Sequence, residues 1–273
     1  MPHSFRLFCV ALVTLCLSGC LNRVGVDDFE ALGPIEQPTT FTSTDFTAIL
    51  SAHVDDAGLV DYAGLVANPN ALDAYLTRLA TTDPANLSDD ERLAFWINAY
   101  NAYTLYLIRD QYPTEGILKT VSGPFIPTVN SPFSNSFAVV GGRSMSLDDI
   151  EHGTIRTEFE ESRIHFAVNC AALSCPPLRA EAYEGATLDA QLTEQTRRFL
   201  TDPERTQIDV AKGTARITKI MDWFKGDFGG SDDAVQRWIA PYVDDAQAKA
   251  ALQSASLDVK YMGYDWSLND QAQ

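Results

Sequence analysis

The sequence is poor in basic residues, and this scarcity limits the partners that it can bind. Its 20 Lys and Arg residues stand against 37 Asp and Glu residues, which gives a formal net charge of −17 at pH 7. A chain with this charge repels the phosphate backbones of nucleic acids. No nucleic-acid partner is therefore expected.

Long hydrophobic runs and internal repeats are also missing. The apolar run Leu7 to Leu17, interrupted only by Thr14, has 11 residues, whereas a bilayer-spanning helix needs about 20. We find no repeat of fixed period and no low-complexity tract, so a solenoid or propeller is not supported. With 273 residues, 45% of them hydrophobic, the chain can still bury a substantial core.

The N-terminus closely resembles a bacterial lipoprotein signal. Arg6 precedes the apolar run, and the run ends in Leu17-Ser18-Gly19-Cys20. The resemblance implies cleavage before Cys20 and acylation, for example with palmitate, of its thiol and amine, which would anchor the protein to a membrane. An ordinary secretory signal is the alternative. Leu21 stands where an inner-membrane retention signal usually has Asp, so the expected location is the outer membrane, facing the periplasm.

These features divide the chain into three parts. Residues 1–19 are the expected signal peptide, residues 20–40 carry the lipidated Cys20 and a flexible tether without periodicity, and residues 41–273 form the expected folded domain. Cys9 and Cys16 leave with the signal peptide. Only Cys170 and Cys175 then remain as thiols.

The folded part mixes helices and hairpins without regular βαβ alternation. Apolar spacing and two capping boxes, which begin at Ser88 and Ser146, predict several helices. The predicted helices cover residues 41–53, 72–79, 91–112, 146–155, 188–200 and 234–242, and the predicted hairpins cover 54–60, 137–142 and 207–218. Alternation predicts a strand over 163–170, and 113–136 is a long loop that could cover a site. The fold class is therefore α+β, a single domain with a mostly antiparallel or mixed sheet packed by helices.

Cys170 and Cys175 are the first candidate site residues. A thiolate is an excellent nucleophile when a base or a helix terminus lowers its pKa. The same two residues lie in an oxidising compartment, and the turn between them is compatible with a disulfide. Both interpretations remain open. The pair supplies too few ligands for zinc, so neither a metal nor a cofactor is expected.

His152 is the candidate general base. Asp148 lies four residues earlier on the same helix face and could orient the imidazole. The alternative is a solvated histidine on the polar side of a short helix. His165 is a weaker partner for Cys170, because five positions of regular strand put the two on opposite faces.

Asn98 and Asn101 lie three residues apart on the longest predicted helix. Either amide could orient His152 or line an oxyanion site, or it could tie the helix to a loop backbone. Several late aromatic residues fit core and edge packing and are compatible with a ligand groove. They are Trp223, Phe224, Phe228, Trp238, Tyr261, Tyr264 and Trp266.

A series of short motifs covers nearly all of the chain after the tether. In chain order they are Val60-Asp61-Tyr62, Phe95-Trp96-Ile97-Asn98-Ala99-Tyr100-Asn101-Ala102, Asp149-Ile150-Glu151-His152, Arg163-Ile164-His165-Phe166-Ala167, Ser174-Cys175-Pro176-Pro177, Trp223-Phe224, Asp227-Phe228 and Tyr264-Asp265-Trp266-Ser267-Leu268-Asn269. Together they resemble the family catalogued as domain of unknown function 547, with secreted or lipid-anchored bacterial members. The resemblance implies no established activity. It also implies that Cys175 can be replaced by Ser in plant relatives, which favours Cys170 as the thiol of interest.

The sequence supports two functions. The first is a thiol-dependent acyl hydrolase or transferase that acts on an amide or peptide-like substrate, for which a papain-like or transglutaminase-like fold is one option. Cys170 would then be the nucleophile, His152 the base, and Asp148 or Asn98 the orienting group, with Cys175, His165 and Asn101 as alternates. The second is a non-catalytic envelope binding or scaffold module with a structural Cys170–Cys175 disulfide. In either case the expected partners are a membrane, through Cys20, and a small-molecule or peptide ligand.

Overall fold

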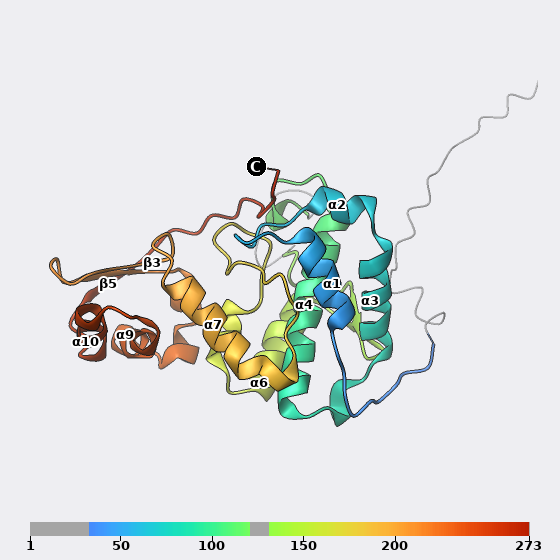
Figure 1. The fold of residues 1–273 in the computed structure, drawn as a ribbon, viewed down its shortest axis with the longest axis horizontal. Coiled ribbons are helices and arrows are strands. Elements are labelled where there is room, and N and C mark those ends of the chain that lie inside the picture. The colour runs from blue at the N-terminus through green and yellow to red at the C-terminus, as the bar shows by residue number, and fades with distance from the viewer. Residues whose placement is uncertain (1–32, 121–130, 273) are drawn as a thin grey trace, which may run out of the picture.

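The helix α4 (Asp89–Gln111) runs through the middle of the N-terminal part of the fold (Figure 1). The computed structural model describes residues 33–120 and 131–272. Ser88 and Glu91 exchange the two hydrogen bonds of the predicted capping box at its start. α1 (Thr44–His53) packs on α3 (Asn70–Thr81), while α2 (Tyr62–Ala67) and α3 both pack on α4.

The middle of the chain adds a hairpin and a broken helix to this part. β1 (Ala138–Val140) pairs with β2 (Arg143–Met145) antiparallel, as predicted. The second predicted capping box begins α5 (Leu147–Ile150), and the helix continues as the π-helical turn η4 (Glu151–Ile155) and α6 (Arg156–Glu158). α7 (Leu188–Leu200) confirms its prediction. Short 3₁₀ turns link these elements: η2 (Pro84–Asn86), η3 (Ile117–Lys119) and η6 (Gly185–Thr187).

The C-terminal part is built on a three-stranded sheet with its own apolar core. β3 (Thr206–Asp209) and β4 (Thr214–Ile217) form the predicted antiparallel hairpin. Between β4 and the parallel strand β5 (Asp258–Tyr261) lie α8 (Ile220–Trp223), η7 (Lys225–Phe228), α9 (Asp232–Ile239), η8 (Ala240–Tyr242) and α10 (Ala246–Gln253). The predicted helix over 234–242 is thus α9 plus η8, and α10 and β5 were not predicted. The sheet is mixed and the fold is α+β, as expected.

The predicted strand over 163–170 is wrong. Residues Ser162–Phe166 form the 3₁₀ turn η5, in which the Ala167 and Val168 N–H groups both donate to the Ile164 carbonyl. The alternation of apolar residues has a different cause, because Ile164 enters the N-terminal core and Phe166 enters the C-terminal core. The segment therefore connects the two cores, and its side chains do not follow the two-faced rule of a strand.

The end of the chain returns from the sheet to the N-terminal part. Leu268 pairs with Ala172, and Asp270 pairs with Val60. The Tyr62 hydroxyl donates to the side chain of Asn269 at 2.8 Å. This return places the residues after β5 beside the turn that follows Cys170. Figure 1 shows the C-terminus near the top of the view, to the left of α2.

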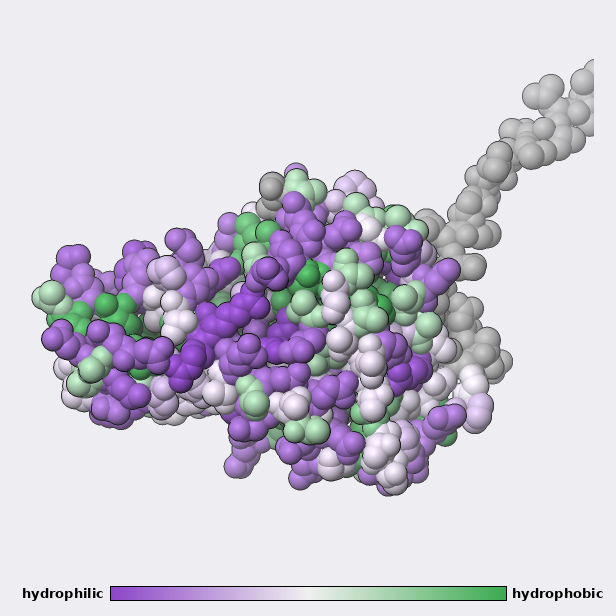
Figure 2. All heavy atoms as spheres, viewed as in Figure 1, coloured by the Kyte–Doolittle hydropathy of each residue, from purple (hydrophilic) through white to green (hydrophobic). Residues whose placement is uncertain are grey.

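Part of the expected tether contacts the fold. The Glu36 N–H donates to the Thr81 carbonyl, and the Asp83 N–H donates to the Glu36 carbonyl, so contacts with the fold begin before residue 41. The expected signal peptide and Cys20 lie outside the described residues, as does 121–130 of the long predicted loop. None of the helices described in 33–120 and 131–272 combines the length and the hydropathy that a bilayer-spanning segment needs. Hydrophilic side chains cover most of the face drawn in Figure 2.

Candidate functional site

A solvent-open pocket of about 150 Å³ lies where α4, α5 and η4 meet α8 and the returning C-terminal segment. Its polar lining consists of Asp148, Glu151, His152, His165 and the two cysteines. The rest of its wall is formed by Tyr100, Phe133, Val168, Pro176, Ile220, Trp223, Phe224, Tyr264 and Trp266. The pocket thus collects the predicted thiol, histidine and Asp148 candidates.

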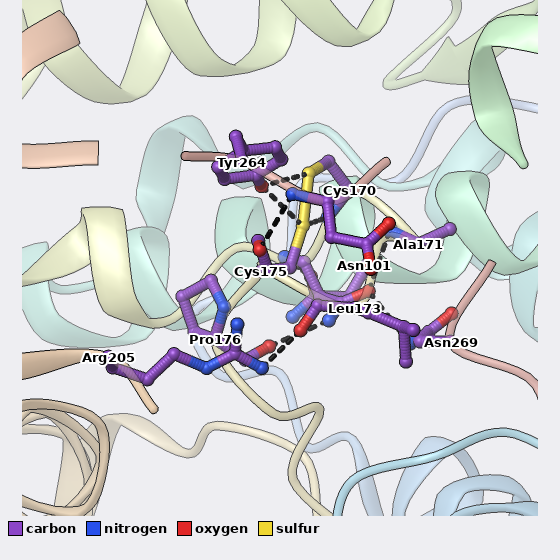
Figure 3. The surroundings of a disulfide bond; sticks show 12 residues. Asn101, Cys170, Ala171, Leu173, Cys175, Pro176, Arg205, Tyr264 and Asn269 are labelled. Atoms are coloured by element: carbon purple, nitrogen blue, oxygen red, sulfur yellow. Dashed lines mark hydrogen bonds between the residues drawn. A yellow bond between two sulfur atoms is a disulfide. The ribbon is translucent and has the colours of Figure 1, made fainter. Parts of the chain in front are cut away.

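Cys170 and Cys175 are joined in a disulfide, with their Cα atoms 6.2 Å apart. The Tyr264 hydroxyl lies 3.1 Å from each sulfur (Figure 3), and the Cys170 N–H donates to the Cys175 sulfur at 3.0 Å. Burial raises the pKa of Tyr264 well above its usual value, so its hydroxyl keeps the proton and can donate it to sulfur. Neither cysteine is a free thiol in this state.

Cys170 does not lie at the start of a helix. It precedes a turn in which Ala171 has a positive φ of 58°, and within the described segment 170–184 no helix begins. In papain-type enzymes a helix dipole lowers the pKa of the catalytic thiol. No helix of the described segment is placed to have this effect on Cys170.

Asn101 anchors this turn and does not reach His152. Its side chain donates to the Ala167 carbonyl at 3.1 Å and accepts from the Asn169 N–H at 2.8 Å. Asn169 in turn accepts from the Ala171 N–H and donates to the Pro176 carbonyl. The structural alternative for Asn101 is the correct one, because its amide serves the backbone that carries the disulfide.

The prediction that Asn98 orients His152 is also wrong. Its amide nitrogen donates to the Tyr183 carbonyl at 2.7 Å and to the Ser43 hydroxyl at 3.1 Å. Its oxygen accepts from the Tyr183 N–H at 2.9 Å. All of these partners lie outside the pocket lining, so Asn98 ties α4 to two distant segments.

Glu151 is a carboxyl group of the pocket for which the sequence patterns predicted no role. It is buried, and one of its oxygens lies 3.8 Å from Nδ1 of His152 and 3.8 Å from Nδ1 of His165. Burial raises the pKa of Glu151 to about 7, against the opposing effects of Arg156 and of a hydrogen bond with Tyr100. Near neutral pH this carboxyl can therefore either release or accept a proton.

His165 is held by the carboxylate of Asp227, for which the sequence patterns also predicted no role. Its Nε2 lies 2.7 Å from Asp227, and its ring stacks on Phe224 with the ring centres 4.0 Å apart. Burial lowers the pKa of His165 to about 4, so the neutral ring donates from Nε2. Nδ1 is then an acceptor, and this buried atom has no hydrogen-bond partner within the described residues.

Arg156 completes this arrangement. Its guanidinium makes two hydrogen bonds to Asp227, at 2.7 and 2.9 Å, and it holds the pKa of Asp227 at about 2. It also lies 3.3 Å from Nδ1 of His152, which identifies that nitrogen as an acceptor. The only sequence signal that could have pointed to Asp227 was its place in the motif Asp227-Phe228, which resembles the family pattern.

Asp148 lies beside His152, as the helical spacing predicted. Its carboxylate is 3.9 Å from Nε2 of His152 and accepts from the Ser134 hydroxyl at 2.6 Å. Burial lowers the pKa of His152, and Arg156 lowers it further. The imidazole is therefore neutral near pH 7 and can accept a proton.

The described residues contain no group of three or more His, Cys, Asp or Glu side chains arranged to hold a metal ion. The pocket wall contains two neutral imidazoles, those of His152 and His165, the carboxyl group of Glu151 with a pKa of about 7, and several aromatic rings. This set can bind an organic group and exchange a proton with it.

Residues 84–200 match the family described as "Protein of unknown function, DUF547". This match supports the family that the sequence motifs resembled. No curated protein and no solved structure matches the chain. The DUF547 segment contains the pocket residues from Tyr100 to Pro176, whereas Asp227 and the aromatic residues from Trp223 onward follow it.

Proposed function

We propose that this chain is an envelope protein that binds a small organic ligand in the pocket, with the Cys170–Cys175 disulfide as a structural part of the pocket wall. The disulfide is the main support for this proposal, because it leaves neither Cys170 nor Cys175 as a free thiol that could act as a nucleophile. The turn around it is also bonded to the backbone through Asn101 and Asn169. A volume of about 150 Å³ suits one side-chain-sized group or the end of a longer ligand.

Thiol labelling tests the structural role of the disulfide. We expect that a maleimide adds no mass to the described cysteines of the native protein until a reductant is present, and that it then adds two labels. The intact mass before and after reduction measures this directly. The Cys170→Ser/Cys175→Ser double variant, which accepts no label at these positions in either condition, is the control.

A second candidate function is thiol-dependent acyl hydrolysis or transfer, and the shared pocket favours it. Cys170, His152 and Asp148 all line this pocket, so a reduced Cys170 would have a base and an orienting carboxylate nearby. Two labels without reductant, one reacting well below the ordinary thiol pKa of about 8.5, would establish this candidate and contradict the structural disulfide. The substrate would then be an amide or peptide-like compound.

We also propose that the protein is anchored to the outer membrane through Cys20 and faces the periplasm. The lipoprotein-like signal supports this location, and a disulfide is typical of an oxidising compartment. In a bacterial host with a lipoprotein pathway, the Cys20→Ala variant should incorporate no labelled palmitate, because it lacks the thiol that is acylated. The Ser18→Ala variant keeps the cysteine and should incorporate the label. Equal incorporation by both variants would contradict the anchor.

A further inference from the structure

The pocket carries an aromatic cluster on the side of the returning C-terminal segment. The ring centres of Trp223 and Tyr264 are 4.6 Å apart, as are those of Tyr264 and Trp266. Trp223 and Trp266 lie 5.8 Å apart, so the three rings contact one another. Trp223 lines the pocket and is 45% exposed, so the protein leaves much of this residue uncovered. Such a cluster offers π faces to a ligand.

The pocket wall also carries carboxyl groups, and no basic side chain of the described lining neutralises them. Asp148 and Glu151 line it, and no Lys or Arg is among its described lining residues. The Arg156 guanidinium is engaged by Asp227 and packs over Phe224 at 5.0 Å. Both lining imidazoles are neutral near pH 7, since burial lowers the pKa of His152 and of His165.

The electrostatic character of the pocket follows from these contacts. An ionised Glu151 has two acceptor nitrogens at 3.8 Å, one on each imidazole, so neither ring donates a hydrogen bond to it. Tyr100 supplies a hydrogen bond, and Arg156 attracts the carboxylate from outside the pocket wall. The negative charge is therefore only partly compensated by the protein. The net charge of −17 adds a weak attraction for cations over the whole chain.

Aromatic faces and carboxylates together select one class of ligand. The negative face of an aromatic ring attracts a cation, and quaternary ammonium groups are bound in this way by aromatic cages. Cavities of about 150 Å³ hold one benzene-sized molecule, and the pocket has this volume. An alkylammonium group is of similar size. An anionic ligand, by contrast, would meet carboxylates that the pocket wall does not neutralise.

We propose that the ligand group bound in this pocket is an organic cation of the quaternary ammonium type. This inference rests on the proposed binding function and adds the chemical class of the ligand. Trp223, Tyr264 and Trp266 contact the alkyl face of the cation, and Asp148 and Glu151 supply the counter-charge.

A matched pair of probes tests this proposal on the purified protein with its disulfide intact. Choline and its neutral carbon isostere 3,3-dimethylbutan-1-ol have nearly the same shape and differ in charge. Titration calorimetry at pH 8 and constant ionic strength should give at least tenfold tighter binding of choline. Equal affinities for the two probes would overturn the cation inference.

Variants of pocket residues, compared with a variant outside the pocket, test whether choline binds in the pocket. Trp223→Ala should weaken choline binding about tenfold, since it removes the type of ring face that attracts a cation most strongly, whereas Trp223→Phe should retain most of the affinity. Glu151→Gln should weaken choline binding without changing that of the isostere. Val66→Ala removes an equally exposed apolar side chain outside the pocket lining and should have no effect. Choline binding that is insensitive to Trp223→Ala would also overturn the inference.

A fragment screen by NMR separates this inference from the proposed function. If neutral or anionic fragments bind and Trp223→Ala abolishes their binding, the pocket is a ligand site but the cation assignment is wrong. If no fragment of any charge binds in the pocket, both proposals fail.

Discussion

The Glu151→Gln variant should be more stable than the parent protein at pH 8, by about 3 kcal/mol in the free energy of unfolding. Burial raises the pKa of Glu151 from 4.5 to about 7, so the folded protein holds this proton more tightly than the unfolded chain does. The stabilisation from the protonated carboxyl is complete below pH 4.5 and is lost as the pH rises through 7. A neutral glutamine does not undergo this loss.

Denaturant unfolding at pH 4, 6 and 8 measures the effect. The difference between Glu151→Gln and the parent should grow in favour of the variant with rising pH. Glu204→Gln removes an exposed carboxyl group and serves as the control. A pH-independent difference for Glu151→Gln would show that the pKa of this carboxyl is the same in the folded and the unfolded protein.

The Asn98→Ala variant should lose about 3 kcal/mol of stability, because a buried amide with several hydrogen bonds leaves its partners unsatisfied when it is removed. Those partners are the Tyr183 N–H and carbonyl and the Ser43 hydroxyl. Thermal or urea unfolding measures the loss. Ligand binding by the folded fraction should be unchanged, since Asn98 does not line the pocket.

Asn86→Ala is the matched control for this variant. Asn86 is exposed and donates one long hydrogen bond, of 3.4 Å, to the Gln37 carbonyl. We expect a change within about 0.5 kcal/mol. If Asn98→Ala were as mild as this control, the amide would not be the structural tie between α4 and residues 43 and 183.

Local signals predicted the elements whose boundaries depend on short-range contacts. Ser88 and Ser146 start α4 and α5 because their hydroxyls satisfy N–H groups three residues later. The same kind of rule places Asp148 beside His152, since residues four apart lie on one face of a helix. The hairpin of β3 and β4 follows from its alternation and its turn.

Long-range contacts explain what the pattern reasoning missed. The segment from Arg163 to Cys170 alternates because Ile164 and Phe166 enter different cores, and sequence alternation cannot distinguish this from one strand with two faces. Asn98 and Asn101 carry amide groups that could in principle orient a histidine. Their actual hydrogen-bond partners lie 55 to 85 residues away along the chain. β5 pairs parallel to β4, and three α-helices lie between the two strands in the sequence. No local sequence signal predicts such a pairing.

The sequence by itself determined the α+β class, the approximate positions of most of the longer helices and part of the set of polar residues that line the pocket, because these depend on periodicity, caps and residue chemistry. Only the tertiary structure decided how that set is used. The chain end returns to the turn after Cys170, so that Tyr264 meets the disulfide. The 3₁₀ turn η7 separately brings Asp227 to His165. Burial by these distant segments then sets the protonation of Glu151, and burial is a property of packing that no single stretch of sequence contains.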